Sequence, residues 1–381
     1  MNLKERFDIF FSIIEDTRNQ SYIKYSLADI LFIVMCGILA GCTDIQRIVE
    51  FATARINLLK KYLIIDKIPC LNTITRILGI IDPYKLNISI IGIMKHVMAR
   101  GTKEIEKQII LDGKTICSTA TMSDYDAPLH IITALLADMA MSIGQITVQD
   151  KSNEIPAVRE LLEIVDIKNA IVTMDAMHCQ KETLSLIQEK HGDYVVQLKR
   201  NQGIFYEDVK LMFDHKIADK SLDYRNEYTR FQTVEKTGGR IETRTCYVLN
   251  SVEGFDYRQD WAGLKTIFAV KRKTEYNGKV TTEFSYYLSS IHTIPEKLLE
   301  YTRKHWQIES FHWILDVNFR EDTCRVHNKK AQENLNILRK IAINIHKTYI
   351  EKTKKKNKAI SSSMFNCLIN EQELENILVT I

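Results

Sequence analysis

"KQIILDGKTI" (residues 107–116) is the stretch where the chain changes from helical to strand-forming sequence. Its run of apolar and β-branched residues predicts a short buried strand that ends at Asp112. A second run of this kind, "NAIVTMDAMH" (169–178), ends at Asp175 and is followed by a helical pattern. Because functional groups in α/β sheets gather at the carboxyl ends of strands, we expect the two aspartates to lie close together.

The sequence around these two runs alternates between strand and helix patterns. We predict two strands with a turn over 129–150, a helix over 155–167, a helix over 180–192 and a strand over 193–202. Strands that alternate with helices predict an α/β domain with some parallel pairing. We place this domain at 101–350.

Three other segments differ from this domain in their pattern of apolar and charged residues. Apolar residues at helical spacing over 1–100 predict a small all-helical N-terminal domain. A β-rich insertion is expected at 215–292, with the Asn277-Gly278 pair forming a hairpin turn. The segment 351–381 is predicted to be a basic tail, because "EKTKKKNK" (351–358) holds five lysines and one glutamate. Such a run is either a solvated segment or a phosphate-binding one.

Two long helices are expected between the insertion and the tail. Thr293 and Glu296 predict a capping box at the start of the first helix, with Pro295 in its first turn. Helical periodicity then continues to Phe319, and a second helix is expected over 331–350.

Composition excludes several classes of protein. The 381 residues are 45% hydrophobic, which is enough for real cores, and the formal net charge is only +4. The eight cysteines form no C-x-x-C pair, which argues against a zinc ribbon or a disulfide framework and suits a reducing cytoplasm. The sequence predicts no signal peptide and no membrane span. The usual motifs of P-loop NTPases, dinucleotide-binding enzymes and HExxH metalloproteases are absent.

A third acidic residue stands out in "YTRKHWQIESFHWILDVNFRED" (301–322). On one helix, Glu309 would share a face with His305, His312 and Asp316, at offsets of three, four and seven residues. Three carboxylates suit Mg²⁺, which takes oxygen ligands, and two such ions can clamp both oxygens of a phosphoryl displacement.

Each of these residues also has a simpler interpretation. Asp112 beside Gly113 is typical of a turn, and Asp175 of a helix N-cap. Glu309 is also compatible with a capped or paired, partly buried carboxylate. A further alternative is a zinc site made by His305, Glu309 and His312, although it leaves the two aspartates without a role.

Several motifs in chain order resemble one known family. They are "ILDGKTI", "DKSNEIPAVRELL", "IVTMDAMHCQ", "GDYVVQLKRNQG", "GRIETR" and "HWQIESFHWILDVNFRED". Over residues 5–350 the chain resembles DDE-type insertion-sequence transposases with a ribonuclease-H-like core, and most closely the H-repeat-associated proteins.

The resemblance implies a fold, a reaction and a set of ligands. Asp112 would lie on a first strand, Asp175 on a fourth strand, and Glu309 on a helix after the β-rich insertion. These three acids would be the catalytic residues and would hold two Mg²⁺ ions, with Mn²⁺ as a substitute. The partner would be double-stranded DNA, at element ends and target, bound by a homodimer in the bacterial cytoplasm and nucleoid.

Nine basic or amide residues are candidates to contact DNA phosphates: Lys114, Lys199, Arg200, Asn201, Gln202, Arg240, Arg244, Arg303 and Arg320. For each arginine, a surface charge or a local ion pair is an equally good interpretation. Two alternatives to a transposase remain open: a catalytically decayed DNA-binding remnant of an insertion element, and a ribonuclease-H-like nuclease without strand transfer.

The chain also departs from the family pattern near these motifs. Cys117 replaces an arginine after "DGK", Arg200 a glycine, and Gly238 a histidine. The tyrosine, arginine and lysine that flank the glutamate in related transposases are replaced by Thr302, His305 and Asp316. These changes affect DNA handling more than metal binding. Were Glu309 dispensable, Glu321 would be the next candidate.

Overall fold

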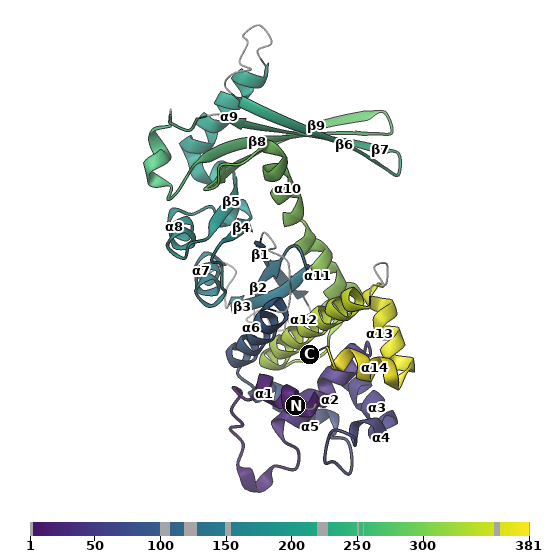
Figure 1. The fold of residues 1–381 in the computed structure, drawn as a ribbon. Coiled ribbons are helices and arrows are strands. Elements are labelled where there is room, and N and C mark those ends of the chain that lie inside the picture. The colour runs from purple at the N-terminus through teal and green to yellow at the C-terminus, as the bar shows by residue number, and fades with distance from the viewer. Residues whose placement is uncertain are drawn as a thin grey trace.

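A computed structural model describes residues 3–99, 107–117, 128–148, 154–218, 228–249, 251–253, 255–353 and 359–380. Within these residues one nine-stranded sheet has the order β3-β2-β1-β4-β5-β9-β8-β7-β6. The N-terminal and C-terminal helices gather at one end of the sheet, and strands β6 to β9 extend from the other (Figure 1). The predicted α/β fold class, with a helical N-terminal region and a β-rich insertion, is confirmed.

The first five strands make a ribonuclease-H-like core. Their bounds are β1 Lys107–Ile116, β2 Leu129–Leu136, β3 Met141–Val148, β4 Ala170–Met174 and β5 Asp193–Leu198. The first three strands pair antiparallel, whereas β1, β4 and β5 pair in parallel. Helices α7 (Glu154–Ile164) and α8 (Lys181–Glu189) pack against each other and against one face of this sheet. Helices from later in the chain cover the other face, which explains why the strands are apolar on both faces. As the resemblance implies, the first strand carries Asp112 and the fourth ends just before Asp175.

The insertion continues the core sheet. It comprises α9 (Gly203–Ala218), β6 (Tyr228–Thr237), β7 (Arg240–Leu249), β8 (Thr266–Tyr276) and β9 (Lys279–Ser289). Strand β9 pairs antiparallel with β5, so the inserted strands are hydrogen-bonded directly to the core. The predicted hairpin turn between β8 and β9 is confirmed: Asn277 and Gly278 both have positive φ, at 48° and 73°.

The helix expected to run from Pro295 to Phe319 is two helices. They are α10 (Pro295–His305) and α11 (Gln307–Val317), and the prediction of one continuous helix is therefore wrong. The i→i−4 hydrogen bonds of the helix are interrupted at Trp306. There, Trp306 N–H donates to Arg303 O, and Glu309 N–H donates to Trp306 O. These i→i−3 bonds are the tighter 3₁₀ type, which commonly marks a break in a helix.

The start of α10 also differs in part from the prediction. Pro295 does occupy the first turn, because its missing N–H costs nothing there. The capping box is wrong: Ile294 is the N-cap residue and makes no side-chain bond to the helix end.

The N-terminal region folds as α1 (Leu3–Phe11), α2 (Leu27–Leu39), α3 (Ile45–Ala54), α4 (Ile56–Leu59), α5 (Leu71–Ile80) and α6 (Pro83–Ala99). Ser26 and Asp44 cap α2 and α3 with side-chain bonds to the first turn. The 24-residue helix α12 (Lys329–Lys352) packs against α2, α5, α6 and β3. One long helix therefore joins the helical region to the core sheet (Figure 1).

The C-terminal segment holds two helices, α13 (Ile360–Ile369) and α14 (Glu371–Leu378). They pack against α12, and Glu371 and Glu375 accept ion pairs from Arg55 and Lys61 at 3.1 and 3.0 Å. The lysines of 354–358 lie outside the described residues. In the described part of the chain, no helix is long and apolar enough to cross a membrane.

Candidate active site

Asp112 and Asp175 are neighbours in the fold. Leu111 and Met174 are register partners on the parallel strands β1 and β4, so Asp112 and Asp175 follow a paired position on both strands. Side chains alternate along a strand, so these two carboxyl groups start from the same face of the sheet. The convergence predicted from the sequence is thus what the fold produces.

The simpler interpretations of these aspartates do not fit the structure. Strand β1 continues through Asp112 and Gly113 to Ile116, paired with β2 throughout, so this is no turn. The prediction that the strand ends at Asp112 is therefore wrong: only its pairing with β4 stops there, after Leu111. Asp175 precedes the 3₁₀ turn Ala176–His178, but its side chain makes no capping bond there, and the N-cap residue of α8 is Gln180.

The electrostatics of the pair favour a bound cation. Burial, helped by the neighbouring Asp175 carboxylate, raises the pKa of Asp112 to about 6. His305, whose Nε2 lies 3.7 Å from Asp175 Oδ1, holds the pKa of Asp175 below its usual range despite partial burial. Two carboxylates this close repel each other, and a proton or a metal ion between them relieves that repulsion.

Helix α11 lies across Asp112 on the same face of the sheet. His312 Nδ1 is 3.7 Å from Asp112 Oδ2. Burial lowers the pKa of His312 to about 3, so the imidazole is neutral at pH 7 and this contact is not an ion pair. His305, at the end of α10, also places its Nδ1 3.2 Å from Thr173 Oγ1. The two histidines therefore face different aspartates, which removes the support for a zinc site between them.

Glu309 lies in the first turn of α11 and is exposed to solvent. The structure brings Asp112 and Asp175 together, and it places the end of α10 against Asp175 through His305 and α11 against Asp112 through His312. Among the described residues, no three histidine, cysteine or acidic side chains are grouped closely enough to hold a metal ion as they stand. Glu309 thus lies on a helix that contacts Asp112 but is not part of a preformed three-carboxylate cluster.

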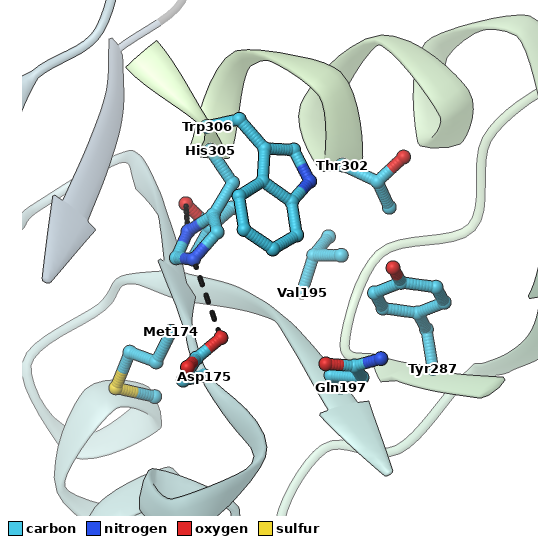
Figure 2. A pocket seen from close by; sticks show the side chains of 9 residues that line it. Met174, Asp175, Val195, Gln197, Tyr287, Thr302, His305 and Trp306 are labelled. Atoms are coloured by element: carbon cyan, nitrogen blue, oxygen red, sulfur yellow. Dashed lines mark hydrogen bonds and ion pairs between the residues drawn. The ribbon is translucent and has the colours of Figure 1, made fainter. Parts of the chain in front are cut away.

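A pocket opens beside Asp175, between β4, β5, β9 and α10 (Figure 2). His305 and Trp306 line one side, and Gln197 and Tyr287 line the other. The Trp306 side chain is 54% exposed. Sequence reasoning missed Gln197 and Tyr287, which are register partners on β5 and β9. No local motif marks them, because only the pairing of the inserted strand with the core brings them here.

Three candidate DNA-contacting residues have structural partners instead. Lys114 Nζ donates to Asp316 Oδ1 at 2.6 Å and to Glu321 Oε2 at 3.1 Å. Asn201 Nδ2 donates to Ala176 O at 2.8 Å, and Gln202 Nε2 donates to Cys179 O at 2.5 Å. The two amides therefore hold the loop that follows Asp175.

The remaining candidates lie on the surface. Lys199, Arg200 and Arg320 are exposed, and the charge of Lys199 contributes to the lowered pKa of Asp175. Arg240, Arg244 and Arg303 belong to an ion-pair cluster on the insertion together with Arg272, Glu235, Glu242 and Glu283. Glu321, the reserve candidate for the third acid, is fully buried and bonded to Asn336 at 2.7 Å, away from solvent.

Comparisons with known proteins agree with the motifs. A family model described as "Transposase DDE domain" matches residues 107–345, and one described as "DDE_Tnp_1-associated" matches residues 9–92. The "Putative transposase YncI" of Escherichia coli O157:H7 is 33% identical over 342 residues, which cover 88% of this chain and 86% of that protein. The "H repeat-associated putative transposase YhhI" of Escherichia coli K12 is 34% identical over 352 residues, 91% of each. A solved piggyBac transposase synaptic complex with hairpin DNA aligns with 100% of this chain and 81% of that one, at 12% identity and a TM-score of 0.45.

Proposed function

The chain belongs to the family of proteins with a transposase DDE domain, and from this premise we propose that it cuts and joins DNA at the ends of an insertion element. The reaction is a metal-dependent hydrolysis of a phosphodiester bond, followed by attack of the freed 3′-hydroxyl on target DNA. The observation that carries the proposal is the Asp112–Asp175 pair, whose two members directly follow the last paired position of the adjacent parallel strands β1 and β4, with α11 lying across Asp112.

The donor set fits divalent metal ions. Asp112, Asp175 and Glu309 offer only carboxylate oxygens, which are the ligands that Mg²⁺ and Mn²⁺ prefer. The raised pKa of Asp112 supports this, because a carboxylate that is costly to ionise alone gains most from a cation beside it. Two ions held there would stabilise the attacking and the leaving oxygen of the phosphodiester.

The register between α11 and β1 supports Glu309 as the third ligand. His312 on α11 contacts Asp112 on β1. Four residues further along the helix, Asp316 contacts Lys114, which lies two residues further along the strand. Four helical residues and two strand residues both span about 6–7 Å, so helix and strand run in step. Glu309 precedes His312 by three residues and therefore shares its face, one turn nearer to the His305 contact with Asp175.

The exposed basic residues around the pair supply the DNA contacts in this proposal. Lys199 and Arg200 follow β5 beside the Asp175 loop, and Arg320 follows α11. The insertion cluster has four arginines against three glutamates, so it remains net positive next to α10. Phosphate contacts of this kind position DNA without reading its sequence. Lys114, Asn201 and Gln202 act by holding the protein's own elements in place.

The proposal assigns a role to each part of the chain. Residues 1–100 form the associated helical domain, 101–350 the catalytic domain with its insertion at 215–292, and 351–381 the C-terminal segment. Two element ends must be handled together, so we propose a homodimer assembled on DNA, tested by light scattering with and without DNA.

One assay tests the chemistry. Purified protein is incubated with linear DNA that carries the flanking element ends, with Mg²⁺ or with EDTA. Metal-dependent nicking with joined products supports the transposase; nicking without joining favours a plain nuclease; DNA binding without nicking favours a decayed remnant. Asp112→Ala, Asp175→Ala and Glu309→Ala should abolish cutting and retain DNA binding. Glu296→Ala, an exposed glutamate on α10, is the matched control.

A further inference from the structure

A buried polar cluster lies on the opposite face of the sheet from α11. Asp112 and Lys114 face α11, so Gly113 and Thr115 face the other way, toward α7. There, Glu154 begins α7 and is only 5% exposed, and His130 on β2 is also 5% exposed. His178, in the turn after Asp175, is 2% exposed. None of these three residues belongs to the carboxylate site described above.

Glu154 links the strand of one aspartate to the loop of the other. Its Oε1 lies 2.8 Å from His130 Nε2, and His130 Nδ1 lies 2.9 Å from Thr115 Oγ1 on β1. Its Oε2 lies 3.8 Å from His178 Nε2, three residues after Asp175. One carboxylate therefore contacts a group bonded to the Asp112 strand and a group in the Asp175 loop.

The packing around this cluster is tight. A Cβ atom at Gly113 would lie 2.6 Å from His130 Nε2 and 3.3 Å from Glu154 Oε2. The 2.6 Å contact is shorter than real Cβ atoms show, so a larger residue next to Asp112 would fit only if the His130 ring shifted. A movement of Glu154 or His130 would consequently be passed to the backbone beside Asp112.

Burying a carboxylate in such a place is costly unless hydrogen bonds compensate for the lost water. An apolar side chain of the same size would fill the space at less cost, so the carboxylate has a use beyond filling it.

We propose that Glu154 is a positioning residue that, through His130 and His178, fixes the spacing of Asp112 and Asp175 for metal binding. This inference rests on the proposed function, since it assumes that the two aspartates bind a metal ion. Asn201 and Gln202 hold the Asp175 loop from the other side, so the loop is clamped between β5 and α7.

The test measures the affinity of the protein for Mn²⁺ in the absence of DNA. The concentration of free Mn²⁺ is read from its electron paramagnetic resonance signal, so no catalytic turnover is needed. Glu154→Met keeps the volume but removes both contacts, and should weaken Mn²⁺ binding by about tenfold, the lower end of the effect of residues behind metal ligands. Glu154→Gln can still accept from His130 and should stay within about threefold of the unmodified protein. Glu160→Met, an exposed glutamate of the same helix, should bind Mn²⁺ normally.

A second variant guards against simple misfolding. The double variant Glu154→Met/His130→Leu leaves no unpaired group between the two positions, so it should fold and yet show the same weak binding. Thermal unfolding of each variant confirms the fold. Normal Mn²⁺ affinity in either folded variant would overturn the role of Glu154. If instead Asp112→Ala binds Mn²⁺ as the unmodified protein does, the metal site itself is wrong and both proposals fall.

Discussion

Replacing Lys114 with methionine tests whether this lysine holds α11 against β1 or contacts DNA. The ammonium lies 2.6 Å from Asp316, 3.1 Å from Glu321 and 3.6 Å from Asp322, and its side chain is 13% exposed. Burial disfavours the ammonium, but these carboxylates outweigh it and raise the pKa of Lys114. A raised lysine pKa stabilises the fold fully below about pH 10, so the whole effect is present at neutral pH.

The loss of stability in Lys114→Met depends on the buried Glu321 carboxylate, which loses its lysine partner. Glu321 is 0% exposed, and removing one partner of a buried ion pair costs about 3–5 kcal/mol. Asn336 still donates to Glu321 at 2.7 Å and Arg339 remains 3.7 Å away, so we expect the lower end, about 3 kcal/mol.

Urea denaturation followed by circular dichroism measures this free energy of unfolding. The control is Lys61→Met, since Lys61 pairs with Glu375 at 3.0 Å but is 56% exposed, and should lose less than about 1 kcal/mol. DNA affinity of the Lys114 variant, measured against salt concentration, should keep the slope of the unmodified protein. A stability loss below about 1 kcal/mol together with a slope reduced by about one would refute the reasoning and return Lys114 to the phosphate contacts.

Three further predictions follow from single side chains. Burial lowers the pKa of His178 to about 4, so the folded state binds a proton there less readily than the unfolded state. The contribution of neutral His178 to the stability of the fold is therefore complete above about pH 6.5 and is lost as the pH falls toward 4. The melting temperature of the unmodified protein should therefore fall relative to His178→Gln across that window; parallel curves would contradict the assignment. Gly113→Ala should destabilise by about 1–3 kcal/mol through its clash with His130, whereas Gly92→Ala, a helical glycine with open space around it, should not; equal melting temperatures would show that the cluster yields. Trp306 is exposed at the pocket, so bound DNA should quench its fluorescence, and the quenching should be smaller in Trp306→Phe, in which the exposed Trp313 still contributes; unchanged quenching would place Trp306 away from the DNA.

Local patterns in the sequence predicted most of the framework. Apolar runs identified β1 and β4, because strands buried on both faces leave no alternation to obscure them. The Asn277-Gly278 turn was predictable since few other residue pairs adopt two positive φ angles. The proximity of Asp112 and Asp175 followed from the same reasoning, although β1 runs on to Ile116 because its pairing with β2 continues after its pairing with β4 has stopped.

Other features were out of reach of local patterns. The break at Trp306 escaped detection because it contains neither proline nor glycine and keeps helical periodicity across it. The prediction of a capping box was wrong because the helix begins one residue later than the Thr293–Glu296 spacing implies. Ile294 is the N-cap residue, and its side chain has no oxygen that could accept a hydrogen bond from the first turn. Lys114 carries the same charge whether it meets a phosphate or a buried carboxylate, and only the position of Glu321, 207 residues later, distinguishes the two.

The sequence by itself determined the order of strands and helices, the family motifs, and an aspartate next to each of two buried apolar runs, since each depends on residues close together in the chain. The tertiary structure decided what those residues touch. It assigned Lys114 to an ion-pair network, gave His305 and His312 to different aspartates, and placed Glu154 on the far face of the sheet. The contacts of Lys114, His305 and His312 join segments more than a hundred residues apart, and Glu154 reaches His130 only because α7 packs on β2. All of them exist only once packing has set the distances.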